Sequence, residues 1–135
     1  MEKKNYNLEK KIKNYKKSIK IFRGKYILKN KNNFNKKSNY LAFCGLGTPE
    51  SFFDLLRENS IKVKHKMIFP DHYNYSLNDI KLIKELSSKK NLKIVTTEKD
   101  YIKLKNINKF KIICAEVMLK IDKPNNFKKF LLDSL

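Results

Sequence analysis

The sequence predicts an α/β fold, in which a mostly parallel β-sheet carries helices on its faces. From residue 39 to the end, short apolar runs typical of buried strands alternate with stretches of helical periodicity. This alternation is typical of right-handed βαβ units, which build parallel sheets. Three short polar motifs directly follow apolar runs, so each should lie where a strand ends. Ligands of open α/β folds bind at that edge, which is where the sequence predicts a functional site.

The length of 135 residues suits one compact domain preceded by a polar extension. Residues 1–37 are predicted to be this basic extension. It would contain a weak amphipathic helix over residues 8–18, a strand over residues 20–28, and a solvated loop of Lys and Asn from residue 29 that serves as a linker. Residues 38–135 are predicted to form the α/β domain.

The first half of this domain reads as strand, turn, helix and strand. Residues 39–44 (NYLAFC) form an apolar run that stops at glycine, as a buried parallel strand does. Thr48 and Pro49 suit the N-cap and the first position of a helix over residues 51–59. Residues 61–69 alternate apolar side chains with lysines and predict a strand near the sheet edge. The core face of the helix would be formed by Phe52, Phe53, Leu55 and Leu56.

The second half continues the alternation of strands and helices. Ser76 and Asp79 have the spacing of a capping box and predict the start of a helix. Residues 91–95 predict the next strand, and Thr97 suits the N-cap of a short helix after it. Residues 110–119 (FKIICAEVML) predict the strongest strand of the chain. The apolar stripe of the Ser76 helix would be Leu77, Ile80, Ile83 and Leu86, and a last helix after Pro124 would turn Phe127, Phe130, Leu131 and Leu135 inward.

The formal net charge of +19 suggests an anionic partner, such as nucleic acid or an acidic lipid surface. Among the 32 basic residues only Arg23 and Arg57 are arginine, the side chain that binds two phosphate oxygens at once. Lysine, asparagine and isoleucine are abundant throughout, which favours compositional drift over a dedicated phosphate-binding face. A small basic nucleic-acid-binding protein, or a membrane-surface protein without catalysis, is the alternative to an enzyme.

Cys44 and Cys114 each lie inside an apolar segment, with no second cysteine at metal-ligand spacing. Buried, reduced thiols are usual for such cysteines, which favours the cytosol. The sequence contains neither a secretion signal nor a run of about 18 apolar residues. Two histidines and two separated cysteines do not make a metal centre, so no metal-binding residue is predicted.

The first motif, Gly45-Leu46-Gly47, stands between a predicted strand and a predicted helix. Its backbone N–H groups could hold an anion at the helix N-terminus. The third glycine of a dinucleotide-binding G-x-G-x-x-G is missing, and no acidic residue ends the next strand. A tight turn packed against the sheet is therefore favoured over a dinucleotide site.

The second motif, Asp71-His72-Tyr73-Asn74-Tyr75, places a carboxylate beside a histidine at a strand end. An acid that holds an imidazole raises its basicity, so Asp71 and His72 are candidates for proton transfer. In the alternative reading, Asp71 caps the loop and His72 merely packs.

The third motif, Thr96-Thr97-Glu98-Lys99-Asp100, offers hydroxyls, carboxylates and an ammonium within five residues. Helix capping explains Thr97 and Glu98. Lys99 and Asp100 are then left to form an ion pair with each other or to contact a substrate.

Taken together, the motifs resemble those of the tetraacyldisaccharide 4'-kinase family, in its C-terminal half. The family pattern runs approximately F-x-G-I-G-x-P-x-x-F-F, F-P-D-H-H/Y-x-Y and T-T-E-K-D-x-x-K-L, in this order. The corresponding stretches here are residues 43–53, 69–75 and 95–104. The resemblance extends over residues 21–135.

The resemblance implies an ATP-dependent lipid kinase that phosphorylates the 4'-hydroxyl of a tetraacyldisaccharide 1-phosphate in lipid A biosynthesis. It also implies a peripheral location on the cytoplasmic side of the inner membrane, with contact to anionic lipid. The family fold is a P-loop α/β domain followed by a smaller α/β domain, and this chain resembles the smaller one. His72, beside Asp71, matches a histidine that assists an aspartate of the P-loop half in activating the sugar hydroxyl. The residues expected to contact substrate or to build the loops are Gly45, Gly47, Tyr75, Thr97, Glu98, Lys99 and Asp100.

The resemblance implies ATP and Mg²⁺ as cofactors, yet the sequence has no G-x-x-x-x-G-K-[ST] loop to hold nucleotide phosphates. In the family, the P-loop and the magnesium ligands precede the matched region. The chain is therefore expected to be a truncated or split kinase that is inactive alone and acts with a separate N-terminal P-loop half. Nucleic acid is not an expected partner.

Overall fold

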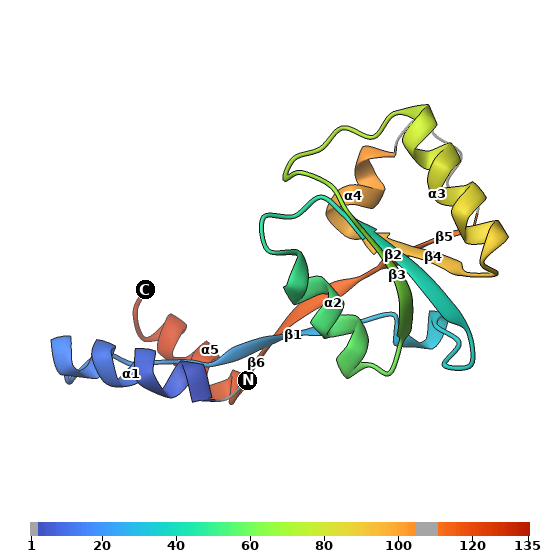
Figure 1. The fold of residues 1–135 in the computed structure, drawn as a ribbon. Helices are drawn as coiled ribbons and strands as arrows, with labels where there is room; N and C mark the ends of the chain where they lie inside the picture. The colour runs from blue at the N-terminus through green and yellow to red at the C-terminus, as the bar shows by residue number, and fades with distance from the viewer. Residues whose placement is uncertain (1–2, 105–110) are drawn as a thin grey trace. The chain divides into compact units, whose positions relative to one another are not determined.

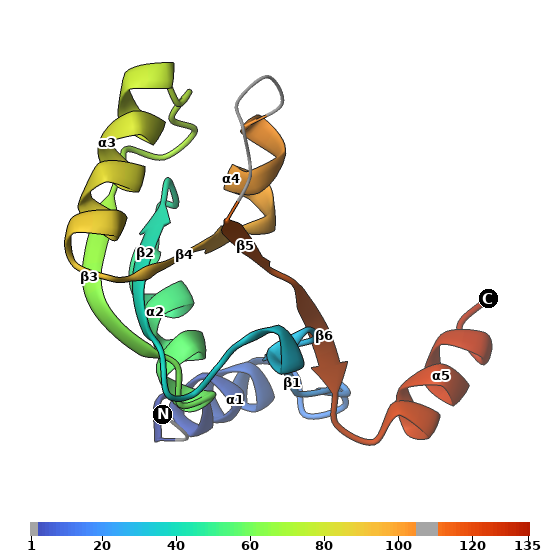
Figure 2. The same cartoon turned by 90° about the vertical axis from the view of Figure 1, so that its right-hand side faces the viewer.

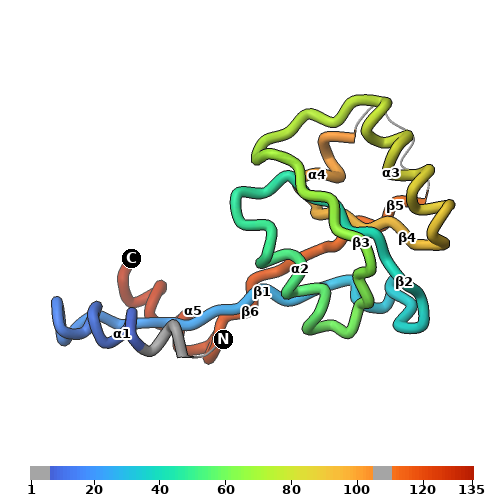
Figure 3. The backbone as a smooth tube through the Cα atoms, viewed as in Figure 1, coloured from blue at the N-terminus to red at the C-terminus, as the bar shows by residue number. Residues whose placement is uncertain are grey.

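The computed structural model describes residues 3–104 and 111–135, which form two compact units (Figure 1). Unit 1 consists of the residues up to Lys25 and from Leu119 onward, and unit 2 consists of Tyr26–Met118. Figure 3 follows the backbone, which begins and ends in unit 1. Within the described residues, no helix is both long enough and apolar enough to cross a membrane.

Helices and strands alternate along the chain, as the sequence predicts. In chain order they are α1 (Lys3–Tyr15), β1 (Gly24–Leu28), the 3-10 helix η1 (Lys31–Asn33), β2 (Asn39–Cys44), α2 (Pro49–Glu58), β3 (Lys62–Ile68), α3 (Leu77–Lys89), β4 (Lys93–Thr97), α4 (Glu98–Lys103), β5 (Ile112–Ala115), β6 (Val117–Ile121) and α5 (Pro124–Leu132). The strand predicted over residues 20–28 begins only at Gly24.

Unit 2 is built on a four-stranded sheet with the order β3-β2-β4-β5 (Figure 2). All three strand pairs are parallel, which confirms the predicted α/β class. The central strand β2 is buried along almost its whole length, as its continuous apolar run predicts. The edge strand β3 alternates exposed and half-buried residues, and its register with β2 shifts between Tyr40 and Leu41. Such an irregularity on a lysine-rich edge discourages pairing with other chains.

Alternate residues of β2 face opposite sides of the sheet, and helices cover both. Tyr40, Ala42 and Cys44 pack with the buried residues of α2 on one side. Leu41 and Phe43 pack on the other side, where α3 and α4 lie. The predicted core face of α2 is confirmed, since all four of its apolar residues are buried: Phe52, Phe53, Leu55 and Leu56. In α3 the predicted stripe holds for Ile80 and Ile83, whereas Leu77 is 70% exposed.

Two consecutive crossovers run in opposite directions across the sheet. The crossover through α2 leads to β3 on one side of β2, and the crossover through α3 returns to β4 on the other side. The carboxyl ends of β2 and β4 therefore flank a topological switch point, where open α/β sheets form their ligand-binding crevice. The first motif directly follows β2, and the third motif begins with the last two residues of β4 and continues into α4.

The strand predicted over residues 110–119 is divided in the structure, and Phe110 lies outside the described residues. β5 joins the four-stranded sheet, whereas β6 pairs with β1 in a separate two-stranded sheet. The side chain of Asn30 stabilises the break, because it donates to the Cys114 carbonyl (2.8 Å) and accepts the Glu116 N–H (3.0 Å). The sequence does not reveal this break, because the partner that induces it is 84 residues away from Cys114.

Unit 1 is held together by a few contacts between its first and last segments. The ring of Phe22 lies 5.1 Å from that of Phe127 and 5.3 Å from that of Phe130, both in α5. Arg23 donates a hydrogen bond of 2.8 Å to Glu9 of α1. None of the residues of α5 is buried. The inward orientation predicted for Leu131 and Leu135 is therefore wrong, and both are exposed.

The division of the chain into two units differs from the division at residue 38 that the sequence predicts. Leu28 and Phe34 belong to the predicted extension, yet both are buried in the core of unit 2. The ring of Phe34 lies 5.8 Å from that of Tyr40. Residues 119–135, which the sequence assigns to the α/β domain, group with the N-terminal segment. In the sequence, an isolated apolar residue among lysines gives no indication of the distant strand against which it packs.

Replacing Asn30 with alanine is expected to lower the free energy of unfolding by about 1–3 kcal/mol, since it leaves two partly buried backbone groups without hydrogen bonds. Chemical denaturation followed by circular dichroism measures this change. Asn32→Ala, an exposed residue of the same segment, is the control and should change stability by less than about 0.5 kcal/mol. Equal effects of the two substitutions would show that Asn30 does not stabilise the junction of β5 and β6.

Candidate functional site

A single buried carboxylate joins the first and third motifs. The side chain of Asp100 is fully buried in the first turn of α4. Its Oδ2 accepts the Gly45 N–H (2.9 Å) and the Thr97 hydroxyl (2.7 Å), and the Asp100 N–H in turn donates to Thr97 Oγ1 (3.1 Å). Thr97 is thus the N-cap of α4, as predicted. Asp100 holds the turn after β2 against the turn after β4.

The other oxygen of Asp100 faces Lys103 and the second motif. Lys103 Nζ lies 3.5 Å from Oδ1, and this ammonium supplies a counter-charge that a buried carboxylate needs. The Tyr75 hydroxyl is buried near the same carboxylate without the geometry of a hydrogen bond to any described residue. Burial, followed by the charge of Asp100, raises the pKa of Tyr75. The same two causes raise the pKa of Cys44 to about 11.

Gly45 is required at its position by close packing. A Cβ atom there would lie 2.9 Å from the Pro70 carbonyl oxygen and 3.3 Å from the Tyr75 hydroxyl oxygen. Its backbone N–H already donates to Asp100, so it is not available to an external anion. Gly45 therefore belongs to a tight turn packed against the sheet, as the sequence favours. The Asp100 carboxylate binds its N–H in the way that an anionic ligand would.

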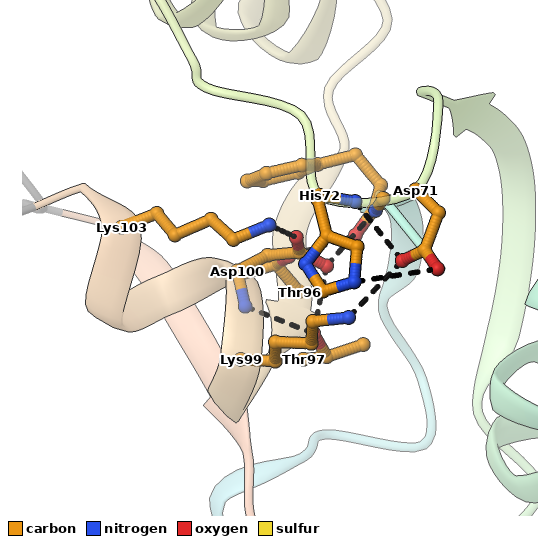
Figure 4. A network of polar contacts seen from close by, with 9 residues as sticks. Asp71, His72, Thr96, Thr97, Lys99, Asp100 and Lys103 are labelled. Carbon is orange, nitrogen blue, oxygen red and sulfur yellow. Dashed lines mark hydrogen bonds and ion pairs between the residues drawn. The ribbon is translucent and has the colours of Figure 1, made fainter. Parts of the chain in front are cut away.

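An ion pair on the surface joins the third motif to the second. Lys99 Nζ lies 3.0 Å from Asp71 Oδ1, and each side chain is a little over 40% exposed. Figure 4 marks this ion pair with a dashed line. The same Asp71 oxygen accepts the backbone N–H of His72 (2.9 Å). The hydrogen bond from Lys99 is the main reason why the pKa of Asp71 lies below its usual value.

One of the two options for Lys99 and Asp100 is wrong, and the contact between Asp71 and His72 is longer than a hydrogen bond. Lys99 does not pair with Asp100; it pairs with Asp71, while Asp100 has Lys103 as its cation. Asp71 does not hold the imidazole of His72 by a hydrogen bond, because the distance from Oδ2 to Nε2 is 3.7 Å. The His72 side chain is 79% exposed, and its backbone has a left-handed φ of 59°. Such a conformation is uncommon for residues other than glycine and is concentrated at functional sites.

An aromatic cluster supports the second motif from below. The ring of Phe69 lies 4.9 Å from that of Tyr73 and 5.0 Å from that of Tyr75, which also packs edge-on against Phe43. Asp79 adds polar support, because its carboxylate accepts hydrogen bonds from the Tyr73 hydroxyl and from Ser76. Ser76 and Asp79 form the capping box that the sequence predicts. The loop that carries His72 is therefore anchored at both ends.

A hollow of about 570 Å³ adjoins the Asp71–Lys99 pair within unit 2. Thr48, Ser51 and Glu98 contribute polar groups to its wall. Gly47 lines it too, and a Cβ on Gly47 would come within 3.3 Å of Asp71 Oδ2. Its apolar lining consists of Tyr26, Leu46, Phe52, Leu55 and Val117. An apolar surface with a few polar groups is typical of binding sites for small molecules. A larger hollow of about 860 Å³ in unit 1 is lined by none of the motif residues.

Most of the predicted site residues meet at the carboxyl edge of the sheet, but their roles differ. Glu98 accepts the Val117 N–H (3.3 Å), which is a structural contact at the start of β6. Lys103, the second lysine of the third family motif, is absent from the predicted site residues; its spacing of three from Asp100 on a helix is the signal that could have indicated its role. Among the described residues, no three His, Cys, Asp or Glu side chains gather as metal ligands would.

Comparison with known proteins gives consistent matches. A model of the family described as tetraacyldisaccharide-1-P 4'-kinase (LpxK) matches residues 2–135. The tetraacyldisaccharide 4'-kinase of Pelagibacter ubique is 38% identical over 125 residues, which are 93% of this chain and 40% of that protein. The corresponding kinase of Rickettsia canadensis is 41% identical over 95 residues, or 70% of this chain and 29% of that protein.

A solved structure is also similar to this chain. The crystal structure of LpxK from Aquifex aeolicus in complex with ATP is similar with a TM-score of 0.53 and 26% sequence identity. The similarity covers 83% of this chain and 35% of that one. The chain therefore spans less than half the length of each of these relatives, and it matches a C-terminal portion of the kinases.

Replacing Asp100 with alanine is expected to lower the free energy of unfolding by about 3–5 kcal/mol, because it leaves Lys103 without its counter-charge and the Gly45 N–H without its acceptor. Asp100→Asn keeps one acceptor and should have a smaller effect. Denaturant unfolding is the measurement, and Glu58→Ala, an exposed acid on α2, is the control. If Asp100→Ala were no more destabilising than Glu58→Ala, the buried carboxylate would not join the two turns.

Asp79→Ala is expected to destabilise the chain by about 1 kcal/mol at pH 7, since it removes half of a capping box. Hydrogen bonds from Ser76 lower the pKa of Asp79 in the folded chain. Its contribution is therefore fully present above the unfolded pKa of about 4 and is lost as the pH falls through the lower folded value. Thermal unfolding at several pH values should show the difference from wild type shrinking below about pH 4.

The control is Glu85→Gln, which changes an exposed acid on the same helix. Its unfolding curve should follow that of wild type at each pH. A constant difference between Asp79→Ala and wild type from pH 7 to pH 2 would contradict a role for the charge of Asp79.

Proposed function

This chain belongs to the tetraacyldisaccharide-1-phosphate 4'-kinase family, and we propose that it forms the smaller α/β part of such a lipid kinase. The complete enzyme would transfer the γ-phosphate of ATP to the 4'-hydroxyl of a tetraacylated disaccharide 1-phosphate in lipid A biosynthesis. The observation that carries the proposal is the meeting of the three family motifs at one sheet edge, through the Asp100 contacts and the Asp71–Lys99 pair.

The nucleotide would be bound mainly by the rest of the kinase. The 135 residues contain no Walker A sequence, and the Gly45 N–H donates to Asp100. At this edge Asp71 and Asp100 are each paired with an ammonium group, and Glu98 accepts the Val117 N–H. Among the described residues these carboxylates do not gather as magnesium ligands would. Mg²⁺ and the ATP phosphates therefore require ligands from a P-loop part, in the same or in a separate chain.

His72 would assist in removing the proton from the sugar hydroxyl. Its ring is exposed at the carboxyl edge, and its Nε2 is turned toward Asp71, which leaves Nδ1 to face a substrate or a residue of the P-loop part. An exposed imidazole can act as an acid–base group, and the Asp71 carboxylate lies 3.7 Å from its Nε2. The neighbouring hollow, with an apolar lining and polar groups in its wall, suits a ligand that is part sugar and part lipid.

Unit 1 has the features of a surface that contacts anionic lipid. Five cations line its hollow together with the carboxylates Glu9, Asp122 and Asp133, and one of the cations, Arg23, donates to Glu9. The cations are Lys13, Lys20, Arg23, Lys123 and Lys129. Leu8, Ile19 and Leu132 of the same unit are exposed apolar side chains. Basic groups near an acidic membrane contribute up to about 1 kcal/mol each, and exposed apolar side chains add to this binding. We therefore propose a peripheral location on the cytoplasmic side of the inner membrane, where the lipid substrate is found.

The proposal is tested by phosphoryl transfer from labelled ATP to the lipid acceptor, with Mg²⁺ present. The chain alone should give no product. Product should form when the chain is combined with the part of the Pelagibacter ubique kinase that lies outside the 125 matched residues. Product from the isolated chain would refute the need for a P-loop part, and failure of every such combination would count against the kinase function.

In the combined enzyme, His72→Ala is expected to lower kcat by about 10²- to 10⁴-fold, as loss of an acid–base group does, and to change KM little. His65→Ala is the matched control, because His65 lies in the middle of β3 rather than at the carboxyl edge, and should leave kcat unchanged. Equal turnover in His72→Ala and wild type would remove His72 from the catalytic residues.

A further inference from the structure

The Asp71–Lys99 pair connects two strands that are not neighbours. Asp71 follows β3 and Lys99 lies in α4 after β4, and β2 stands between these strands in the sheet. The distance of 3.0 Å between Lys99 Nζ and Asp71 Oδ1 therefore links two loops across the Gly45-Leu46-Gly47 turn. The absence of a side chain at Gly47 leaves room for this link, since a Cβ there would lie 3.3 Å from Asp71 Oδ2.

The two oxygens of the Asp71 carboxylate have different surroundings. Oδ1 accepts hydrogen bonds from the Lys99 ammonium and from the His72 backbone N–H, at 3.0 and 2.9 Å. Oδ2 is turned toward the imidazole and lies 3.7 Å from His72 Nε2. Two donors on Oδ1 set the orientation of the carboxylate, and a planar carboxylate fixed at one oxygen is fixed at the other as well. Figure 4 shows Lys99 and His72 approaching the carboxylate of Asp71 together.

His72 has little else to orient its ring. The side chain is 79% exposed, so packing does not select one rotamer. The left-handed backbone of His72 brings the imidazole back over Asp71. The charged groups that face this ring are Asp71 on its own loop and Lys99 on α4, with the buried Asp100 and the partly exposed Lys103 behind them.

We propose that Lys99 is a positioning residue for His72: its ammonium fixes one oxygen of Asp71 and thereby keeps the other oxygen facing the imidazole. This inference deepens the proposed function and rests on it for its catalytic meaning. Lys99 is available for this role because the buried Asp100 has Lys103 as its cation. The sequence leaves Lys99 either as the ion-pair partner of Asp100 or as a substrate contact, and the structure assigns it to Asp71 instead.

The size of the effect follows from exposure. Half-exposed ion pairs couple their members weakly, so removing Lys99 should change the ratio of His72 rotamers by at most about fivefold. The pair is also open to screening, because the Debye length falls to about 3 Å at 1 M salt. Lys99 is therefore expected to modulate the orientation of His72 and not to be indispensable for it.

The test measures the χ1 rotamer populations of His72 by NMR coupling constants in the 135-residue chain. Lys99→Met should lower the ratio of the main rotamer to the others about threefold to fivefold, whereas Lys99→Arg, which keeps a cation, should restore most of it. Lys81→Met, an exposed lysine on α3, is the control and should have no effect. Unchanged rotamer populations in Lys99→Met would overturn the inference.

Two further measurements keep the result independent of folding and of the proposed activity. Wild-type chain in 1 M salt needs no substitution and should show the same loss of rotamer preference; an unchanged preference there would also count against the inference.

In the combined enzyme, Lys99→Met should lower kcat about threefold to fivefold with KM unchanged. Normal kcat in Lys99→Met, with His72→Ala impaired, would reject Lys99 as a positioning residue but keep the kinase. A rotamer change in a chain that yields no active combination would reject the kinase alone.

Discussion

The buried carboxylate of Asp100 is the interaction on which the functional edge of this chain depends. A fully buried charge is unfavourable unless hydrogen bonds and a counter-charge surround it. Here the backbone of one motif, the hydroxyl of another and the ammonium of Lys103 meet this requirement together. The Gly45 N–H, the Thr97 hydroxyl and the Lys103 ammonium all depend on this one carboxylate for a partner. The turns after β2 and β4 therefore form as one structure. A glycine at position 45 is the steric condition for this approach.

Side-chain exposure increases from this carboxylate outward to the solvent. Asp100 is fully buried, the Asp71–Lys99 pair is a little over 40% exposed on each side, and the His72 side chain is 79% exposed. Removing one partner of a buried ion pair is strongly destabilising, whereas an exposed ion pair contributes little to stability. Under the proposed function, such a gradient would combine a fixed inner framework with an outer surface that adjusts to its ligand. The aromatic cluster around Phe69 supports the middle of this gradient from the core side.

The parallel sheet explains why these residues meet at all. Parallel strands end on the same edge, and the reversal of direction around β2 brings loops of opposite crossovers together there. The chain matches a C-terminal portion of its relatives, and its own charged groups at this edge are largely paired with one another. A P-loop part that supplies the phosphate and magnesium ligands would complete this edge, which offers an imidazole and a hollow.

The sequence by itself determined the local elements of this protein. The strand at Asn39–Cys44, the capping box of Ser76 and Asp79, and the cap of Thr97 on Asp100 follow from neighbouring residues, because periodicity and capping act over a few positions. Only the tertiary structure decided which cation pairs with which carboxylate, that Phe34 is buried, and that Asn30 interrupts the strand near Cys114. These outcomes depend on which strands become neighbours, and contacts between residues distant in sequence leave no local pattern that could reveal them.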